Sequence, residues 1–160
     1  MKIMAEDKKN NNLVLAQNKK AYHDYEILEK FECGIVLVGS EVKSVKAGKV
    51  SLKESYARFF DNELWVVGMH IAEFIEANIF NHETTRKRKL LLHKKELKRL
   101  AVKLQNTGLT LIPLKVYRKM HLVKVEIGLC KGKREFEKRE AIKEREVKRE
   151  MDRAVKSFNK

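Results

Sequence analysis

The sequence predicts a mainly β protein with α-helices: an OB-fold-like, six-stranded antiparallel barrel with flanking helices and a basic C-terminal tail. Three observations lead to this fold class. Runs of alternating apolar and polar residues recur along the chain, short turns or helical segments separate them, and the last thirty residues are too charged to form a core. With 160 residues, 43% of them apolar, the chain can support one compact domain with terminal extensions.

The first predicted strand region follows an N-terminal arm. Residues 1–17 are rich in Lys and Asn, which predicts a flexible arm with little order before Asn18. The segment from Tyr22 to Val38 is strand-like, and Gly34 within it permits a bulge or a tight turn. Two strands or one bent strand would fit this pattern.

A short helix is predicted for residues 40–47. Ser40 is a suitable N-cap, and Glu41 falls in the first turn, where a negative charge is favourable. Gly48 follows as a C-terminal stop signal.

Two β-rich runs then form a predicted hairpin. Residues 55–60 and 63–71 are joined by Asp61 and Asn62, residue types that tolerate the left-handed conformations of a two-residue turn. Residues 72–89 show weak periodicity and are expected to form a long surface loop.

A helix and a second hairpin complete the predicted body. Residues 94–106 carry apolar side chains at helical spacing and a basic opposite face. Two alternating strands follow, on either side of a turn at residues 118–121, and Pro113 places the first of them at an edge or a bulge. The expected organisation is an arm over 1–17, a barrel over 18–130 and a tail over 131–160.

The formal net charge of +14 predicts a polyanionic partner. Nucleic acid fits best, because phosphates neutralised by Lys and Arg release counterions, although composition does not separate RNA from DNA. An anionic membrane surface competes for the same charge, but no stretch approaches 18 apolar residues and the N-terminus lacks the apolar core of a signal peptide. We therefore expect a cytoplasmic protein that does not bind membranes.

Patterns typical of enzymes and cofactor sites are missing from the sequence. The five histidines lack metal-binding spacing, and Cys33 and Cys130 are far apart. Two segments contain paired glycines, GSEVKSVKAGK at 39–49 and GLCKGK at 128–133, but neither has the spacing of a phosphate-binding loop. A nuclease using Asp24, Glu26 or Glu41 is the enzymatic alternative, but scattered acids on a basic protein are ordinarily solvated or paired. The expectation is a non-enzymatic protein without a cofactor.

Two basic surfaces are expected on the body. Residues 18–25 combine lysines, an amide, an imidazole and two tyrosines, a mixture used to stack on exposed bases while gripping the backbone. The tyrosines could equally pack the end of the barrel. The run at residues 86–89 and the basic face of 94–106 would contact phosphates or remain solvated.

The tail from Lys131 to Lys160 holds 12 Lys/Arg against 7 Asp/Glu, a net charge of +5. Val147, Met151, Val155 and Phe158 fall on one helical stripe, which predicts an amphipathic helix. Because a charged helix of this length is marginal alone, it is expected to fold on a partner such as RNA. The alternative is a solvated tail that only aids solubility.

Collinear motifs extend from about Asn18 to Arg149, among them NKKAYHDYEILEKFECGIVLVGSEVKSVKAGK, ELWVVGMHI, RKRKLLLHKKEL, GLTLIPLKVY and KGKREFEKREAIKERE. This series resembles the small protein B family of transfer-messenger RNA (tmRNA) binding proteins, also called SsrA-binding proteins. The resemblance implies an OB-like barrel that binds the tRNA-like domain of tmRNA. It also implies delivery of that RNA to stalled ribosomes, known as trans-translation or ribosome rescue, by a bacterial protein that we expect to be monomeric.

The resemblance also implies which residues meet each partner. Those that would bind RNA are Asn18, Lys19, His23, Tyr25, Glu41, Lys43, Ser44 and Tyr56. The tail would enter the decoding centre and the empty mRNA channel of the small subunit as a helix. Its ribosome-binding residues would be Lys131, Lys133, Arg134, Phe136, Lys138, Arg139 and Lys143. Phe136, Glu137 and Val147 depart from the residues usual in the family.

A constitutive ribosomal protein with a tail threaded through ribosomal RNA is the second hypothesis that the sequence leaves open. Such a component would co-purify at about one copy per particle through high salt, whereas an adaptor would be substoichiometric and released by salt.

Overall fold

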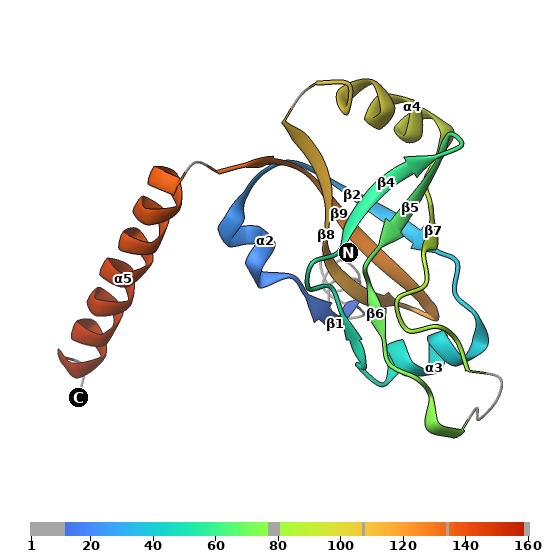
Figure 1. Cartoon of the computed structure of the whole chain (residues 1–160). Coiled ribbons are helices and arrows are strands. Elements are labelled where there is room, and N and C mark those ends of the chain that lie inside the picture. Colours follow the sequence, from blue (N-terminus) through green and yellow to red (C-terminus); the bar gives the residue numbers. More distant parts are fainter. Residues whose placement is uncertain (1–11, 77–80, 107, 134, 159–160) are drawn as a thin grey trace, which may run out of the picture.

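Six antiparallel strands close into a barrel in the computed structural model, which describes residues 12–76, 81–106, 108–133 and 135–158 (Figure 1). The order of neighbours is β8-β4-β5-β7-β2-β9, and β9 pairs back with β8. This arrangement confirms the fold class predicted from the sequence. The barrel strands are β2 (Tyr25–Ile35), β4 (Tyr56–Phe60), β5 (Glu63–Val67), β7 (Arg88–Leu91), β8 (Leu109–Lys119) and β9 (Leu122–Gly132).

A further strand, β1 (Asn12–Gln17), lies along β8 outside the closed ring. The prediction of a flexible arm over residues 1–17 is therefore wrong for residues 12–17, which form β1. Residues 1–11 lie outside the described part of the chain. The physical reason is that β8 pairs with β4 only near Leu111, which leaves one edge of its second half open to β1. Leu15 and Ala16 pack against the core from this strand.

Both predicted hairpins are present. Asp61 and Asn62 join β4 to β5 with φ angles of 50° and 62°, the left-handed conformation that their residue types tolerate. Met120 and His121 join β8 to β9 in a shorter turn than predicted. The register of this pair shifts just after Pro113, which confirms the predicted bulge.

In the described part of the chain, four helices and a small second sheet accompany the barrel. They are α2 (Lys19–Asp24), α3 (Gly39–Lys46), α4 (Lys94–Lys103), α5 (Glu135–Phe158), and the strand pair β3 (Val50–Ser51) and β6 (His70–Ile71). Helices α3 and α4 were predicted, but α2 lies where the strand region was expected to begin. Ser40 is not the N-cap of α3, because Val38 takes that position and its amide donates to Glu41 at 3.0 Å.

The core fills the barrel with aliphatic residues and two thiols. Cys33 and Cys130 are free and fully buried. Burial raises the pKa of the Cys33 thiol to about 12 and that of Cys130 to about 11, so both stay protonated at neutral pH. The fully buried aliphatic residues include Leu64, Val66, Leu111, Leu114, Val125 and Ile127.

A buried ion pair fastens α3 to the strand β7. Glu41 and Arg88 both have side chains with 0% exposure, and Arg88 Nε donates to one carboxylate oxygen. The other oxygen accepts from Arg86 Nη2 at 2.5 Å and from the Val38 amide. The Glu41 carboxylate therefore has partners on both of its oxygens.

The Arg88 guanidinium extends this network to the preceding loop. It donates to the carbonyl oxygen of Met69 at 2.7 Å and to that of Thr84 at 3.1 Å. The prediction of a surface loop over residues 72–89 is wrong for its last two residues, because β7 begins at Arg88. The basic run at 86–89 is likewise not a continuous phosphate-facing surface, since Arg88 is buried and Arg86 is paired with Glu41.

Replacing Glu41 with Gln should lower the free energy of unfolding by about 3 kcal/mol, because two arginines would lose their counter-charge in a buried place. Urea denaturation measures this loss. Glu63→Gln is the matched control: it removes the exposed pair with Lys89 and should cost less than about 1 kcal/mol. Equal losses in the two variants would contradict a special role for the buried pair.

Acid should remove the contribution of Glu41. Burial, the largest influence, raises its pKa, but hydrogen bonds from Arg86, the Val38 amide and Arg88 together hold the pKa below the ordinary 4.5. A carboxyl group with a lower pKa in the folded chain stabilises the fold above its unfolded pKa and loses this effect as the pH falls through the folded pKa. The stability difference between wild type and Glu41→Gln should therefore shrink below about pH 4. A difference that widens in acid, measured by urea denaturation at constant ionic strength, would refute this assignment.

Candidate nucleic-acid interface

Helix α2 lies at one end of the barrel, beside the start of β4, and Asn18 holds it there (Figure 1). Asn18 Oδ1 accepts from the Ala21 amide at 3.1 Å and caps the helix. Its Nδ2 donates to the carbonyl oxygens of Pro113 at 3.1 Å and Leu52 at 3.4 Å. Because its polar atoms are occupied and the residue is buried, Asn18 positions the helix and offers little to a ligand.

A hollow of about 210 Å³ opens between α2 and the turn that precedes β4. Tyr25 is half-buried in its wall and Tyr56 is exposed at its edge, so an aromatic ring can meet a base there. Lys20 adds a cation and Glu54 adds a hydrogen-bond acceptor. The full lining is Asn18, Lys20, Ala21, Asp24, Tyr25, Glu54, Ser55, Tyr56 and Ile112. We call this hollow the α2 cleft.

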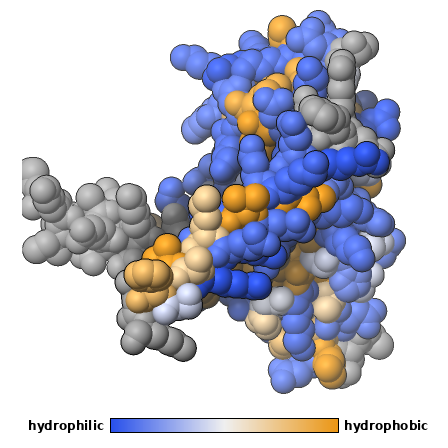
Figure 2. Space-filling view, turned by 90° about the vertical axis from the view of Figure 1, so that its left-hand side faces the viewer, coloured by the Kyte–Doolittle hydropathy of each residue, from blue (hydrophilic) through white to orange (hydrophobic). Residues whose placement is uncertain are grey.

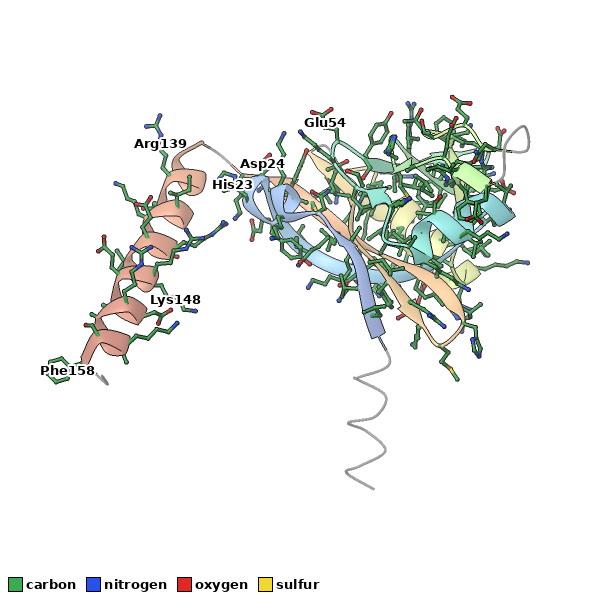
Figure 3. The ribbon with its side chains drawn as sticks, turned by 90° about the horizontal axis from the view of Figure 1, so that it is seen from below. His23, Asp24, Glu54, Arg139, Lys148 and Phe158 are labelled. Atoms are coloured by element: carbon green, nitrogen blue, oxygen red, sulfur yellow. The ribbon has the colours of Figure 1, made fainter. Side chains whose placement is uncertain are left out.

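His23 and Asp24 flank the α2 cleft as an oriented pair. His23 Nδ1 lies 2.8 Å from Asp24 Oδ1, and both side chains are partly exposed. The carboxylate fixes the ring orientation and accepts from Nδ1 when that atom carries a proton, which leaves Nε2 as the outward group. Figure 3 shows these two residues and Glu54 at the same end of the body, the end from which α5 departs.

Polar side chains surround this site. Lys19 is exposed on α2, and hydrophilic residues cover most of the face seen in Figure 2, which views the molecule from the side where α2 and α5 lie. Such a surface suits a polyanion that is bound by its backbone and read at a few bases.

The RNA-binding residues implied by the family resemblance do not form one cluster. Tyr25 and Tyr56 line the α2 cleft, whereas Glu41, Lys43 and Ser44 lie on α3, across the body from α2 (Figure 1). The side chain of Lys43 is exposed, with its Nζ 5.3 Å from the Phe74 ring centroid. The other two α3 residues have 0% exposure and do not reach a ligand in this conformation.

One polar cleft residue, Glu54, lies outside every segment that the sequence indicated. Glu54 has φ of 61° in a tight turn, where Ser55 donates through its amide and its hydroxyl to the Leu52 carbonyl oxygen. No short motif marks this position, because a positive φ is uncommon for glutamate. Lys20, in contrast, belongs to the segment 18–25 that the sequence indicated.

The basic face of α4 is only partly free. Arg99 Nη2 lies 2.8 Å from one carboxylate oxygen of Glu29, and Lys103 Nζ contacts the other. The expectation of a phosphate-facing surface along this helix is therefore weakened at its C-terminal half. Lys94, Lys95 and Lys98 remain exposed at the other half.

The tail leaves the body beside α2. The backbone amide of Lys133 donates to the carbonyl oxygen of Asp24 at 3.0 Å. The side-chain Nζ of Lys133 donates to the carbonyl oxygen of Tyr22 at 3.4 Å. Strand β9 pairs with β2 as far as Gly132, so the body extends beyond the expected boundary at Cys130. Lys131 is exposed in the last part of this strand.

Helix α5 extends away from the body, with Phe158 at its far end (Figure 3). The predicted stripe is present and open: Val147, Met151 and Val155 are 51%, 64% and 59% exposed. Arg139 and Lys143 are exposed on the same helix. Arg134 lies outside the described residues, as do the side chains of Phe136, Glu137 and Lys138.

Neither a metal cluster nor a membrane span was found in the parts of the chain that the structure describes. No group of three or more His, Cys, Asp or Glu side chains there could hold a metal ion. None of the described helices is both long enough and apolar enough to cross a bilayer.

Comparison with known proteins gives concordant matches. The model of the SmpB protein family matches residues 15–157. The SsrA-binding protein of Limosilactobacillus fermentum is 54% identical over 145 residues, covering 91% of this chain and 92% of that protein. That of Carboxydothermus hydrogenoformans is 50% identical over 144 residues, covering 90% and 97%.

A solved structure agrees with these sequence matches. It is described as "tmRNA-SmpB: a journey to the center of the bacterial ribosome", and one of its chains is 48% identical to this one. The TM-score is 0.63, with 79% of this chain and 92% of that chain covered. On this similarity in sequence and in structure, the chain belongs to the SmpB protein family.

Proposed function

We propose that this protein is a cytoplasmic adaptor in ribosome rescue: it binds tmRNA and brings it to stalled ribosomes. The names of its relatives, SsrA-binding proteins, support the RNA partner, and the tmRNA-SmpB structure supports the ribosome. We further propose that the α2 cleft binds the tRNA-like domain, while α5 enters the decoding centre and the empty mRNA channel. The observation that carries it is the direct junction of the cleft with the base of the tail.

The α2 cleft provides the chemistry for RNA. Lys19 and Lys20 are exposed on one helix and can neutralise phosphates, while Tyr25 and Tyr56 offer ring faces to unstacked bases. His23 adds a donor whose orientation is fixed by Asp24. Asn18 supports the site, because it ties the start of α2 to Leu52 in the loop before β4 and to Pro113 in strand β8.

The tail provides a second and separate surface. The 24 residues of α5 extend about 36 Å, long enough to follow a channel far beyond the body. Arg139 and Lys143 can contact ribosomal RNA, and the exposed stripe can pack on apolar parts of the channel wall. Because Lys133 is hydrogen-bonded to α2, RNA in the cleft and the base of the tail keep a defined relation.

A binding function explains the acidic residues better than a nuclease function does. Glu41 is enclosed by two arginines, and Asp24 orients His23. Glu26 is exposed on β2. These carboxylates come from separate places, whereas a metal-dependent nuclease needs them around shared ions.

Tyr56→Ala should weaken binding of tmRNA about tenfold, because stacking of a base on a ring contributes about 1–3 kcal/mol. Calorimetry at one fixed salt concentration measures the affinity. Leu122→Ala is the control, since this residue is 61% exposed at the β8–β9 turn, far from α2 in the fold. Unchanged affinity for Tyr56→Ala, with the melting temperature preserved, would show that the α2 cleft does not stack a base of tmRNA.

Truncation after Lys133 should separate the two functions. We expect the remaining body to bind tmRNA within about threefold of the full chain, because β9 and its contact with α2 are kept. Peptide tagging on stalled ribosomes should be lost in a reconstituted translation assay. Complete loss of RNA binding, or normal tagging, would contradict the proposed division between cleft and tail.

A further inference from the structure

A row of cationic and aromatic side chains crosses the outer face of three barrel strands. Trp65 on β5 lies opposite Arg58 on β4 and opposite Lys89 on β7. Its sequence neighbours Leu64 and Val66 have 0% exposure and face the core. Because side chains alternate along a strand, Arg58, Trp65 and Lys89 share the outer side.

Two more residues complete this surface, which we call the β4–β5–β7 face: Arg58, Phe60, Trp65, Lys87 and Lys89. Lys87 Nζ lies 4.1 Å from the Phe60 ring centroid and 5.0 Å from that of Trp65. Arg58 Cζ lies 5.3 Å from the Phe60 centroid. The cations therefore gather over the two rings.

Acidic partners are scarce on this face. Lys89 Nζ pairs with Glu63 at 3.0 Å. Among the described residues, neither Arg58 nor Lys87 forms an ion pair with a carboxylate, and both are exposed. Cation–π contacts at exposed sites are weak, so these side chains can exchange a ring for a phosphate at small cost.

The rings on the β4–β5–β7 face do not serve the core. Trp65 and Phe60 are half-buried on the outer side and are not members of the core cluster, which holds mainly aliphatic residues together with Phe31. Sheet faces that bind unpaired RNA present two or three aromatic side chains to bases, with cations beside them for the backbone. Three adjacent strands span about 10 Å, the width of a platform for a few nucleotides.

We propose that the β4–β5–β7 face is a second RNA-binding site, which takes unpaired nucleotides. Bases stack on Trp65 and Phe60, while Arg58 and Lys87 neutralise the phosphates. The flexible Lys87 moves from the rings to the backbone and so opens a ring face. None of these residues lines the α2 cleft or belongs to α5, so the site is additional to the surfaces of the proposed function.

Trp65 makes a direct test possible, because it is the chain's single tryptophan. The full-length protein is titrated with decauridylate, an unpaired RNA, while tryptophan emission is recorded. We expect quenching, and an affinity that falls as salt rises. Anisotropy of a labelled decauridylate gives a second readout that does not depend on the fluorophore Trp65. Absence of both signals would overturn the proposal.

Matched variants test the contacts by anisotropy. Lys87→Gln and Trp65→Leu should each weaken decauridylate binding about fivefold or more, because they remove a phosphate contact and a stacking ring. Lys49→Gln, which alters an exposed lysine between α3 and β3, should change it less than about twofold. Equal effects of the two lysine variants, or undiminished binding by Trp65→Leu, would overturn the proposal.

Two further measurements distinguish the β4–β5–β7 face from the α2 cleft and from a docking surface for an acidic protein. Tyr56→Ala should lose affinity for tmRNA but keep the quenching by decauridylate; loss of both would mean that the two surfaces are one site. A decaglutamate peptide should not quench Trp65. Quenching by this peptide as strong as that by RNA would identify an acidic protein as the partner and overturn the RNA assignment.

Discussion

The buried carboxylate of Glu41 is the constraint on which one half of this barrel depends. It binds Arg86 and Arg88, and Arg88 in turn holds the carbonyl oxygens of Met69 and Thr84. A buried charge without its partners is costly, so α3, the loop after β6 and the strand β7 are stable only together. The ion pair therefore also fixes the register of β7, since Arg88 must point inward while its neighbours Lys87 and Lys89 point outward.

The other half of the molecule depends on the amide of Asn18. Its hydrogen bonds place α2 against the loop before β4, and the carbonyl oxygens of Tyr22 and Asp24 at the end of α2 then receive Lys133. The same short helix thus forms a wall of the α2 cleft and contacts the residue after β9, Lys133. The cleft and the end of β9 are therefore joined through a few polar contacts.

The sequence predicted what is set by local patterns and missed what is set by distant contacts. Both hairpins have turn residues and alternation that can be read directly. The role of Glu41 cannot be read this way, because its partners lie 45 and 47 residues away and the motif around it looks like a surface helix. Strand β1 was missed for a similar reason: its partner is the edge of β8 that β4 leaves open, about 100 residues further along the chain. The family resemblance supplied site residues but did not separate those that support the fold from those that face a ligand.

Burial and pairing also decide which of the chain's cations can serve RNA. The formal charge of +14 suggests a uniformly basic surface, but several cations form ion pairs. Arg86 and Arg88 are paired with Glu41, and Arg99 and Lys103 are paired with Glu29. Long-range attraction depends on the whole charge, whereas contact with phosphates needs exposed cations without a carboxylate partner. Among the described residues, such cations lie on α2, on α3, on the first half of α4, on the β4–β5–β7 face and along α5. The proposed contacts with RNA use some of these surfaces, whereas the cations paired with carboxylates stabilise the fold.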